Sequence, residues 1–397
     1  MRVLPSDWQY EAISSVVTET FLANPRKTAP EEEFLYVDIS AIDREKGIIK
    51  NYKRLLGKDA PSRARRKIRE NDVLVSTVRP NLNATALVPK SLDNQICSTG
   101  FCVLRSNGRV IPKYLHFFTR SPQFVKTLVA KTKGASYPAV AVGDVKQVKI
   151  PIPPMETQRK IVTLLERVDS LKHKREKANK LTTRIVKATF LKTFGDLSRN
   201  PKGWEMRRLE DVCYKITDGT HKTPKYVSDG VPFLSVKNIT SGYLDFSDTK
   251  YVTQKEHAKM TKRCKPEKGD LLYTKVGTIG IASIIDTDRE FSIFVSVALL
   301  KPKHELVNSL YLKWMLNSSF VQNQANRRVK GIGVPDLHLV EIKDFKVAIP
   351  PLSEQLVFAK FVSKAETLRQ QQMQSANEIT ELFKSLMHKA FRGQLVT

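Results

Sequence analysis

A short proline motif occurs twice in this chain, and each copy is followed by a long amphipathic segment. The two copies read IPPMETQ at residues 152–158 and IPPLSEQ at residues 349–355. Proline lacks a backbone N–H and clashes with the preceding helical turn, so a helix can begin only after the prolines of each motif. The chain is therefore predicted to alternate a globular part, a long helix, a second globular part and a second long helix.

Apolar residues follow each motif at alternating steps of three and four, which is typical of a coiled-coil helix. The stripe residues are Ile161, Leu164, Val168, Leu171, Ala178 and Ile185 after the first motif, and Phe358, Phe361, Ala365, Leu368, Ile379, Leu382 and Leu386 after the second. The first helix, over residues 161–194, would be about 50 Å long. The first helix leads to the second globular part and the second helix leaves it, so two stripes packed along their length must run antiparallel. Arg175 and Gln372 would then lie near mid-seam, where polar residues can fix the register.

The whole chain repeats itself at a nearly constant offset of 196 to 198 residues. The matched positions include Trp8 with Trp204, Tyr36 with Phe233, Asp72 with Asp270, Tyr114 with Tyr311, and Gly134 with Gly331. Such an offset indicates a tandem duplication and hence a pseudo-two-fold molecule. Arrays of stacked repeats need three or more short units, so two long units favour a bivalent device.

Each globular part is predicted to mix short strands with a helix, because β-branched and aromatic runs alternate with turn residues. The expected strands lie at residues 34–39, 72–78 and 100–104 in the first part, and at 231–236, 270–274 and 294–300 in the second. The expected helices cover residues 114–129, with an interruption at Pro122, and residues 309–323.

The charge of the chain points to a polyanionic partner. Its formal net charge is +27 and its pI is about 9.9. Nucleic acid is the commonest partner of such a chain, ahead of a ribosome or a membrane surface. No apolar run reaches membrane-spanning length, and the N-terminus does not read as a signal peptide, so we expect a cytoplasmic protein without a membrane partner. The four scattered cysteines predict buried thiols rather than a zinc site.

Four basic or turn-rich stretches are the candidate phosphate-contacting edges. Residues 50–69 carry nine cationic side chains without a comparable number of acids, which favours a phosphate-contacting face over a solvated charged surface. The loops at residues 131–137 and 326–331 occupy matching positions in the two repeats. They are either equivalent nucleic-acid edges or a paired structural turn. The loop at residues 217–222 is rich in turn formers and short donors.

Motifs for catalysis are weak throughout. The chain contains no Asn/Asp-Pro-Pro-aromatic loop for an adenine methyltransferase, no dinucleotide fingerprint and no P-loop. Pro335-Asp336 with Glu341 and Lys343 imitates a nuclease signature, but the spacing looks too short for carboxylates that must converge on one magnesium ion.

The order of domain, proline motif, helix, domain, proline motif and helix resembles the specificity (S) subunit of type I restriction-modification systems. Further support comes from Gly195-Asp196 after the first helix and from AFRGQL at residues 390–395. The segments TDGTH at 217–221, GVPFLS at 230–235, KNI at 237–239 and VGTIG at 276–280 are similar to the target-recognition domain of that family.

The resemblance implies an α+β chain with two tandem mixed α/β target-recognition domains and two long helices packed as an antiparallel coiled coil. The recognition domains would be residues 1–150 and 197–347, and the helical spacers residues 151–196 and 348–397. Each domain would read one half of a split site in double-stranded DNA. Two modification (methyltransferase) subunits would dock on the helices, and restriction subunits could join them.

The resemblance also implies that catalysis belongs to the partners. S-adenosylmethionine would bind the modification subunits, ATP and Mg would bind the restriction subunits, and this chain would hold no cofactor, metal or catalytic residue. Arg79, Asn81, Asn83 and Lys275 are candidates for reading bases, because Arg, Lys and Asn can recognise base edges in the major groove. The other residues expected to contact DNA are Lys53, Arg54, Arg63, Arg65, Arg66, Lys133, Tyr137, Thr220, His221, Lys222, Lys237, Asn238, Arg327, Arg328 and Lys330.

Two other hypotheses remain open at this point. The chain could be a self-contained nuclease or methyltransferase with degenerate motifs, or an RNA-binding or coiled-coil adaptor. Turnover without partners would favour the first, and equal affinity for RNA and duplex DNA would favour the second.

Overall fold

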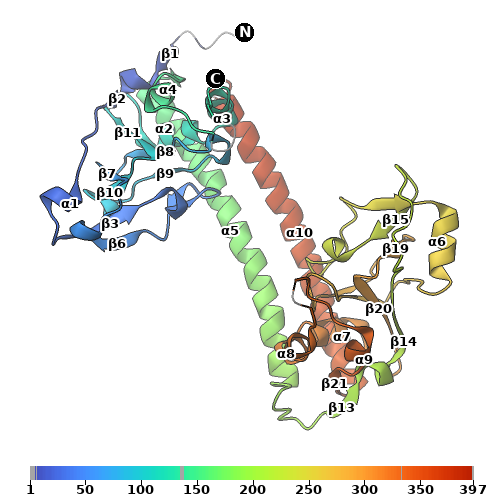
Figure 1. Cartoon of the computed structure of the whole chain (residues 1–397). Helices are drawn as coiled ribbons and strands as arrows, with labels where there is room; N and C mark the ends of the chain where they lie inside the picture. The colour runs from blue at the N-terminus through green and yellow to red at the C-terminus, as the bar shows by residue number, and fades with distance from the viewer. Residues whose placement is uncertain (1–4, 6, 135–137, 332, 396–397) are drawn as a thin grey trace. The chain divides into compact units, whose positions relative to one another are not determined.

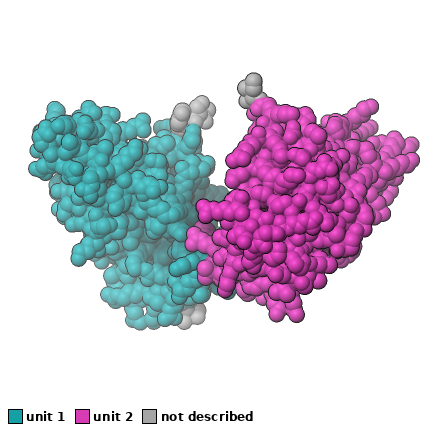
Figure 2. Space-filling model, turned by 90° about the horizontal axis from the view of Figure 1, so that it is seen from below, with its two compact units in different colours: residues 1–177, 373–397 teal, residues 178–372 magenta. Residues whose placement is uncertain are grey.

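The chain divides into two compact units, which are coloured separately in Figure 2. Unit 1 contains residues 1–177 and 373–397, and unit 2 contains residues 178–372. The structure is a computed structural model that describes residues 5, 7–134, 138–331 and 333–395. Two long helices, α5 (Met155–Phe194) and α10 (Leu352–Ala390), each contribute to both units (Figure 1). Each begins directly after the Pro-Pro pair of its motif, as predicted.

The domain of unit 1 consists of short strands and short helices. Its strands are β1 (Gln9–Ala12), β2 (Val17–Thr18), β3 (Glu33–Val37), β4 (Ile42–Asp43), β5 (Ile48–Ile49), β6 (Lys53–Leu56), β7 (Ala64–Lys67), β8 (Val73–Ser76), β9 (Thr85–Leu87), β10 (Ile96–Ser98), β11 (Phe101–Ser106) and β12 (Lys149–Ile152). Its helices are α1 (Pro25–Thr28), α2 (Pro112–Thr119), α3 (Pro122–Val129) and α4 (Val142–Lys146).

The domain of unit 2 repeats part of this order, but in the described part of the chain it has fewer strands and places helix α6 before its central strand. Its strands are β13 (Glu205–Arg208), β14 (Cys213–Asp218), β15 (Val231–Leu234), β16 (Lys250–Val252), β17 (Leu271–Thr274), β18 (Ala282–Ile284), β19 (Ser292–Ile293), β20 (Val297–Pro302) and β21 (Lys346–Ile349). Its helices are α6 (Gln254–Thr261), α7 (Ser309–Leu316), α8 (Ser319–Arg328) and α9 (Leu339–Lys343).

Each unit is built around a four-stranded antiparallel sheet. The strand order is β2-β11-β8-β9 in unit 1 and β14-β20-β17-β18 in unit 2. The central strands β8 and β17 are buried at every position, which explains their unbroken apolar sequence. A second sheet lies in each unit, with the order β6-β3-β10-β7 in unit 1 and β16-β15-β19 in unit 2.

The single helix expected at residues 309–323 is wrong, because two helices occupy this stretch. Helix α7 ends at Leu316 and α8 begins at Ser319. The side chain of Asn317 exchanges two hydrogen bonds with the backbone of Ala282 on β18, which stops α7 at the sheet. The interruption predicted at Pro122 is confirmed, and the Ser121 hydroxyl there caps α3.

The glutamine of each proline motif is buried and holds the entrance of its long helix. The Gln158 Oε1 accepts a hydrogen bond from the Ile111 N–H at 2.8 Å, and its Nε2 donates to the carbonyls of Arg109 and Pro153. The equivalent partners of Gln355 are the N–H of Asn308 and the carbonyls of Leu306 and Pro350. A buried amide is costly to leave unsatisfied, so each glutamine fixes how its helix leaves the strand before it.

The C-terminal end of each long helix places a phenylalanine in a domain core. In unit 1 the ring of Phe391, just after α10, lies 5.3 Å from that of Tyr114. In unit 2 the ring of Phe194 lies 4.8 Å from that of Tyr311. The core of unit 1 thus combines the start of α5 with the end of α10, and the core of unit 2 combines the end of α5 with the start of α10.

The expected apolar stripes are only partly buried, and the prediction is wrong at four positions. Leu171 and Ile185 on α5, and Leu368 and Leu382 on α10, have exposed side chains. The buried residues cluster where each helix meets a domain, as Val162 and Leu165 do near the start of α5. Contacts with the domains therefore determine which face of each long helix is buried, together with contacts with the other helix. A strict heptad pattern does not describe that buried face.

Candidate nucleic-acid interface

The basic stretch at residues 50–69 forms strands β6 and β7 at the two edges of one sheet in unit 1. Lys53 and Arg54 are exposed, and Arg63 is exposed just before β7. Arg65 and Arg66 on β7 are half-buried. The expectation that these cations lack balancing acids is wrong for three of the nine, because acids outside the stretch pair with them. The three ion pairs are Arg54–Glu33 at 2.8 Å, Lys58–Glu31 at 3.0 Å, and Lys50–Asp43.

Two predicted loops of unit 1 lie together. The N–H of Arg79 donates to the carbonyl of Pro138 at 2.7 Å, and Ala139 pairs with both Val78 and Lys133. The structure therefore brings the exposed side chains of Arg79, Asn81 and Lys133 to one loop cluster. Tyr137 belongs to the same loop in sequence, but it lies outside the described residues.

The backbone between Arg79 and Asn83 forms a tight turn. Arg79 and Asn83 have φ values of +48° and +46°, a left-handed conformation that asparagine tolerates better than most residues. The Asn83 side chain donates to the Arg120 carbonyl and accepts from the Thr85 hydroxyl. Asn83 therefore supports this turn from inside, and its amide is already occupied within the protein.

The matching loop of unit 2 has the same backbone pairing. Asp336 pairs with both Lys330 and Val276, as Ala139 does with its two partners 197 residues earlier. Arg327 is exposed, whereas Arg328 contacts Asp344 at 2.9 Å and Lys330 contacts Glu341 at 3.1 Å. The two loops are thus equivalent structural turns, and each also carries exposed cations.

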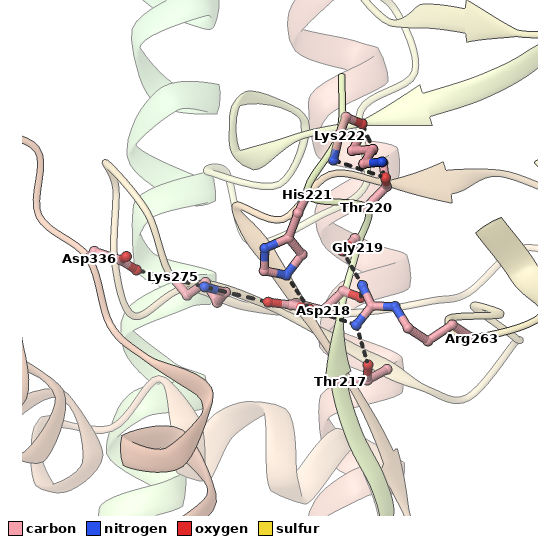
Figure 3. A network of polar contacts seen from close by, with 9 residues as sticks. All are labelled: Thr217, Asp218, Gly219, Thr220, His221, Lys222, Arg263, Lys275 and Asp336. Carbon is pink, nitrogen blue, oxygen red and sulfur yellow. Dashed lines mark hydrogen bonds and ion pairs between the residues drawn. The ribbon is translucent and has the colours of Figure 1, made fainter. Parts of the chain in front are cut away.

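A polar network centred on Asp218 gathers several of the predicted residues of unit 2 (Figure 3). The Asp218 carboxylate lies 3.2 Å from His221 Nε2 and 3.2 Å from Arg263 Nη1. Lys275 Nζ lies 3.7 Å from Asp218 and 3.7 Å from Asp336. Lys275 is only 5% exposed, so it joins two loops from within the protein and is not placed to read a base.

Four other predicted residues of unit 2 surround the turn that follows β15 and the loop that follows β14. Lys237 is exposed and contacts Asp248 at 2.8 Å. Asn238 is buried, and its Nδ2 donates to the carbonyls of Asp245 and Asp248, so it stabilises the turn rather than facing DNA. Thr220 and Lys222 follow the network, with Thr220 half-buried and Lys222 exposed.

Sequence reasoning missed Arg263, which the structure places at the centre of this region. Arg263 follows α6, where residues 255–268 carry six cations and two acids. That run was a usable signal, because like the stretch at residues 50–69 it carries more cations than acids. Lys225 and Lys259 were missed as well, and both are exposed beside the same loop.

The nuclease-like residues do not converge. Asp336 faces Lys275, whereas Glu341 contacts Lys330 and lies near Arg328. Among the residues that the structure describes, no group of three or more His, Cys, Asp or Glu side chains could hold a metal ion. The four cysteines are buried thiols, as predicted, and burial raises the pKa of Cys213 to about 12.

No helix within the described ranges is both long enough and apolar enough to span a bilayer.

Comparison with known proteins settles the family. The chain matches the type I restriction modification DNA specificity domain twice, over residues 5–183 and 201–381. The chain belongs to this family. The two matches start 196 residues apart, which confirms two tandem domains, and the internal offset seen in the sequence is the spacing of two specificity domains.

Several relatives resemble the chain over most of its length. The EcoBI specificity subunit of Escherichia coli is 24% identical over 337 residues, which is 77% of this chain and 70% of the relative. The MjaVIII specificity subunit of Methanocaldococcus jannaschii is 21% identical and spans 99% of this chain and 94% of its own. A solved structure, from a study of complex assembly and conformational transition of the type I R-M system, is 30% identical, covers both chains completely and superposes with a TM-score of 0.65.

Proposed function

We propose that this specificity-domain chain is the DNA-recognition subunit of a type I restriction-modification complex and reads a bipartite site in double-stranded DNA. The observation that carries the proposal is the double match to the specificity domain across nearly the whole chain. Two linked readers make the second half-site encounter intramolecular, which raises affinity without new contacts. The net charge of +27 supplies the salt-dependent attraction to phosphates that any such reader needs.

In this proposal α5 and α10 pack antiparallel along their length and act as the spacer between half-sites. Support comes from each unit separately, since the start of one long helix shares a core with the end of the other. In unit 2 the hydroxyl of Thr182 on α5 bonds the buried side chain of Gln372 on α10 at 3.2 Å, the kind of polar seam contact that fixes a register. Helix α5 has 40 residues and is therefore about 60 Å long, enough for half-sites one DNA turn apart.

Two modification subunits would dock on these helices and supply S-adenosylmethionine-dependent methylation of adenine. Seven large apolar side chains exposed on the long helices, four in the stripes and three beside them, support such docking, because large apolar groups on a surface favour protein contacts. They are Leu171, Met373 and Leu382 in unit 1 and Leu181, Ile185, Leu191 and Leu368 in unit 2. Restriction subunits would add ATP- and Mg-dependent cleavage, and the chain itself would be non-catalytic and act in the cytoplasm, where the DNA is.

Methylation mapping in cells that carry this chain with its modification partner tests the proposal. We expect one split motif with methyl-adenine in both halves. The purified chain alone, incubated with duplex DNA, S-adenosylmethionine and magnesium, should show no turnover. Turnover by the isolated chain, or methylation without a split motif, would contradict the proposal.

A further inference from the structure

We propose that the unit 2 domain binds the sugar–phosphate backbone of one DNA strand in a cleft between loop 219–225 and helix α6. Asp218 and Arg263 are the positioning residues that fix this loop and hold His221 at the rim of the cleft. The proposal rests on the DNA-recognition function above and assigns one half-site to particular residues.

The start of loop 219–225 is held rigidly by backbone hydrogen bonds. The Thr220 N–H donates to the Ile293 carbonyl at 3.1 Å, and the Val295 N–H donates to the Thr220 carbonyl at 3.0 Å. A Cβ atom on Gly219 would lie 2.0 Å from the Ile293 oxygen, so only glycine allows this approach to the end of β19. The side chains that follow Thr220 therefore project from a fixed backbone, as residues that must meet DNA in one geometry require.

Asp218 and Arg263 also hold the start of the loop, from its other side. The Arg263 Nη2 donates to the carbonyls of Asp218 and Gly219, the first at 2.8 Å, while Nη1 reaches the Asp218 carboxylate. Because the Arg263 guanidinium already donates several hydrogen bonds to the loop, its role is to hold the loop and not to bind a phosphate. The same carboxylate holds His221, whose side chain is 66% exposed (Figure 3).

Helix α6 forms the second wall and is tied to the same strand. The Thr253 hydroxyl caps its N-terminus by accepting from the Glu256 N–H. The buried His257 Nδ1 lies 2.9 Å from the Ser292 hydroxyl on β19. Helix α6 lies beside β19 in Figure 1, so both walls share one anchor and keep a fixed separation.

The cleft between these walls has a volume of about 640 Å³ and is strongly basic. Lys222, Lys225 and Lys259 are exposed at the surface of the cleft, and Arg263 also lines it. Glu256 is the carboxylate in the lining, and it is paired with Lys259 at 3.1 Å. Such a charge excess suits a phosphate backbone, whose neutralisation releases counterions.

Unit 1 offers a contrast at the matching positions. Where unit 2 has α6, unit 1 has a single turn at Gly57–Asp59. The position 197 residues before Asp218 is Phe21, an exposed aromatic residue. Among the described residues, unit 1 therefore has no equivalent of helix α6 to form such a cleft, and loss of the unit 2 cleft should affect one half-site.

The first experiment measures the salt dependence of duplex binding for Lys222→Ala/Lys225→Ala in the full chain. Removing two phosphate contacts should lower the slope of log K against log salt by about two, since each contact contributes roughly 0.9. Lys346→Ala, which removes an exposed lysine from β21, is the matched control and should leave the slope within half a unit. Hydroxyl-radical footprinting on the mapped target should show protection lost at one half-site only. An unchanged slope, or loss at both half-sites, would overturn the proposal.

The second experiment tests the positioning residues by measuring how strongly the chain prefers the correct half-site over an altered one, rather than its overall affinity for DNA. Backbone contacts fix the register in which the rest of the domain meets the bases. We therefore expect Asp218→Asn, which frees the loop, to reduce the preference for the correct half-site about tenfold, the scale of one good base contact, and to leave the other half-site unchanged. His221→Ala should have a similar effect. Because His221 is mostly exposed, this variant tests the proposal even if Asp218→Asn does not fold. Unchanged discrimination in the folded His221→Ala protein would overturn the role of the loop.

The wild-type chain separates this inference from the proposed function. If the wild-type chain prefers its mapped target but the variants behave like it, only the cleft assignment fails. If the wild-type chain shows no preference for duplex DNA with the split motif, the proposed function fails, and the cleft assignment fails with it.

Discussion

The two units share an inner scaffold and differ at the outer edge. Both bury the glutamine of the proline motif against the same three backbone groups, and both pack a phenylalanine from a long helix against the equivalent tyrosine. At the edge, unit 1 presents two short basic strands, whereas unit 2 presents helix α6 and the network around Asp218. The comparison teaches that the residues needed to join a domain to its helices recur, while the residues that face outward are free to differ.

A physical reason underlies this division. A buried amide or aromatic ring must satisfy fixed partners, so the same scaffold geometry demands the same side chain. An outward loop only has to be anchored, and many combinations of hydrogen bonds anchor a loop. Two domains with different outward faces can therefore share one duplicated scaffold.

Removal of the paired phenylalanines should break the scaffold in both units to a similar degree. We expect Phe194→Ala and Phe391→Ala each to lower the free energy of unfolding by about 3–5 kcal/mol, because each leaves a cavity in an aromatic core. Urea unfolding monitored by tryptophan fluorescence measures the loss. Leu191→Ala, at an exposed position on the same helix as Phe194, should cost under about 1 kcal/mol. A large loss for one phenylalanine and a negligible one for the other would contradict the equivalence of the two scaffolds.

Mild acid should destabilise unit 1 but not unit 2, because unit 1 has a buried histidine at position 116 where unit 2 has Lys313. Burial lowers the pKa of His116 in unit 1 to about 3, whereas Lys313 in unit 2 contacts Glu366 at 2.9 Å. A lowered folded-state pKa means that the unfolded state binds the proton first, so stability is complete above pH 6.5 and falls as the pH decreases from there towards 3. We expect unit 1 to lose about 1.4 kcal/mol between pH 7.5 and 5.5.

Hydrogen exchange at the two pH values locates this loss. Faster opening should appear in β8, β9 and α2 of unit 1 and should be absent from β17, β18 and α7 of unit 2. His116→Gln should remove most of the pH dependence. Equal acid sensitivity of both units, or an unchanged profile in the variant, would show that His116 is not the cause.

The sequence was sufficient for the duplicated plan and for most elements. The proline motifs located both long helices, and apolar runs located β3, β8, β11, β15 and β17, because strong local patterns decide local structure. The break in the helix after Ser309 was missed, since it depends on Asn317 meeting Ala282 on a distant strand. The exposed positions of Leu171 and Leu382 were missed for a similar reason, because the domains rather than the heptad pattern determine which helix face is buried.

The candidate interface was harder to predict than the fold. Composition correctly marked basic stretches, but it could not show that Glu33 reaches Arg54 or that Lys275 is enclosed by two carboxylates. Those outcomes depend on which segments meet in space. Arg263 was missed because its role is to hold backbone carbonyls, and such a role leaves no motif in the sequence.

The smallest expected effect concerns the acids that sit among the cations of each edge. Glu33 pairs with Arg54 in unit 1, and Glu256 pairs with Lys259 in unit 2. Both pairs are largely exposed, so Glu33→Gln and Glu256→Gln should change stability by under about 1 kcal/mol.

Each of these two changes should nevertheless strengthen binding to duplex DNA about two- to threefold at low salt, because it removes a negative charge beside a cation of the proposed interface. The gain should vanish at high salt, where exposed charges are screened. Glu381→Gln on α10 removes an exposed, ion-paired acid outside both edges and should leave affinity unchanged. A gain of the same size in all three variants would mean that net charge alone attracts DNA. A gain confined to Glu33→Gln and Glu256→Gln would mean that each unit meets DNA through its own edge, despite their different construction.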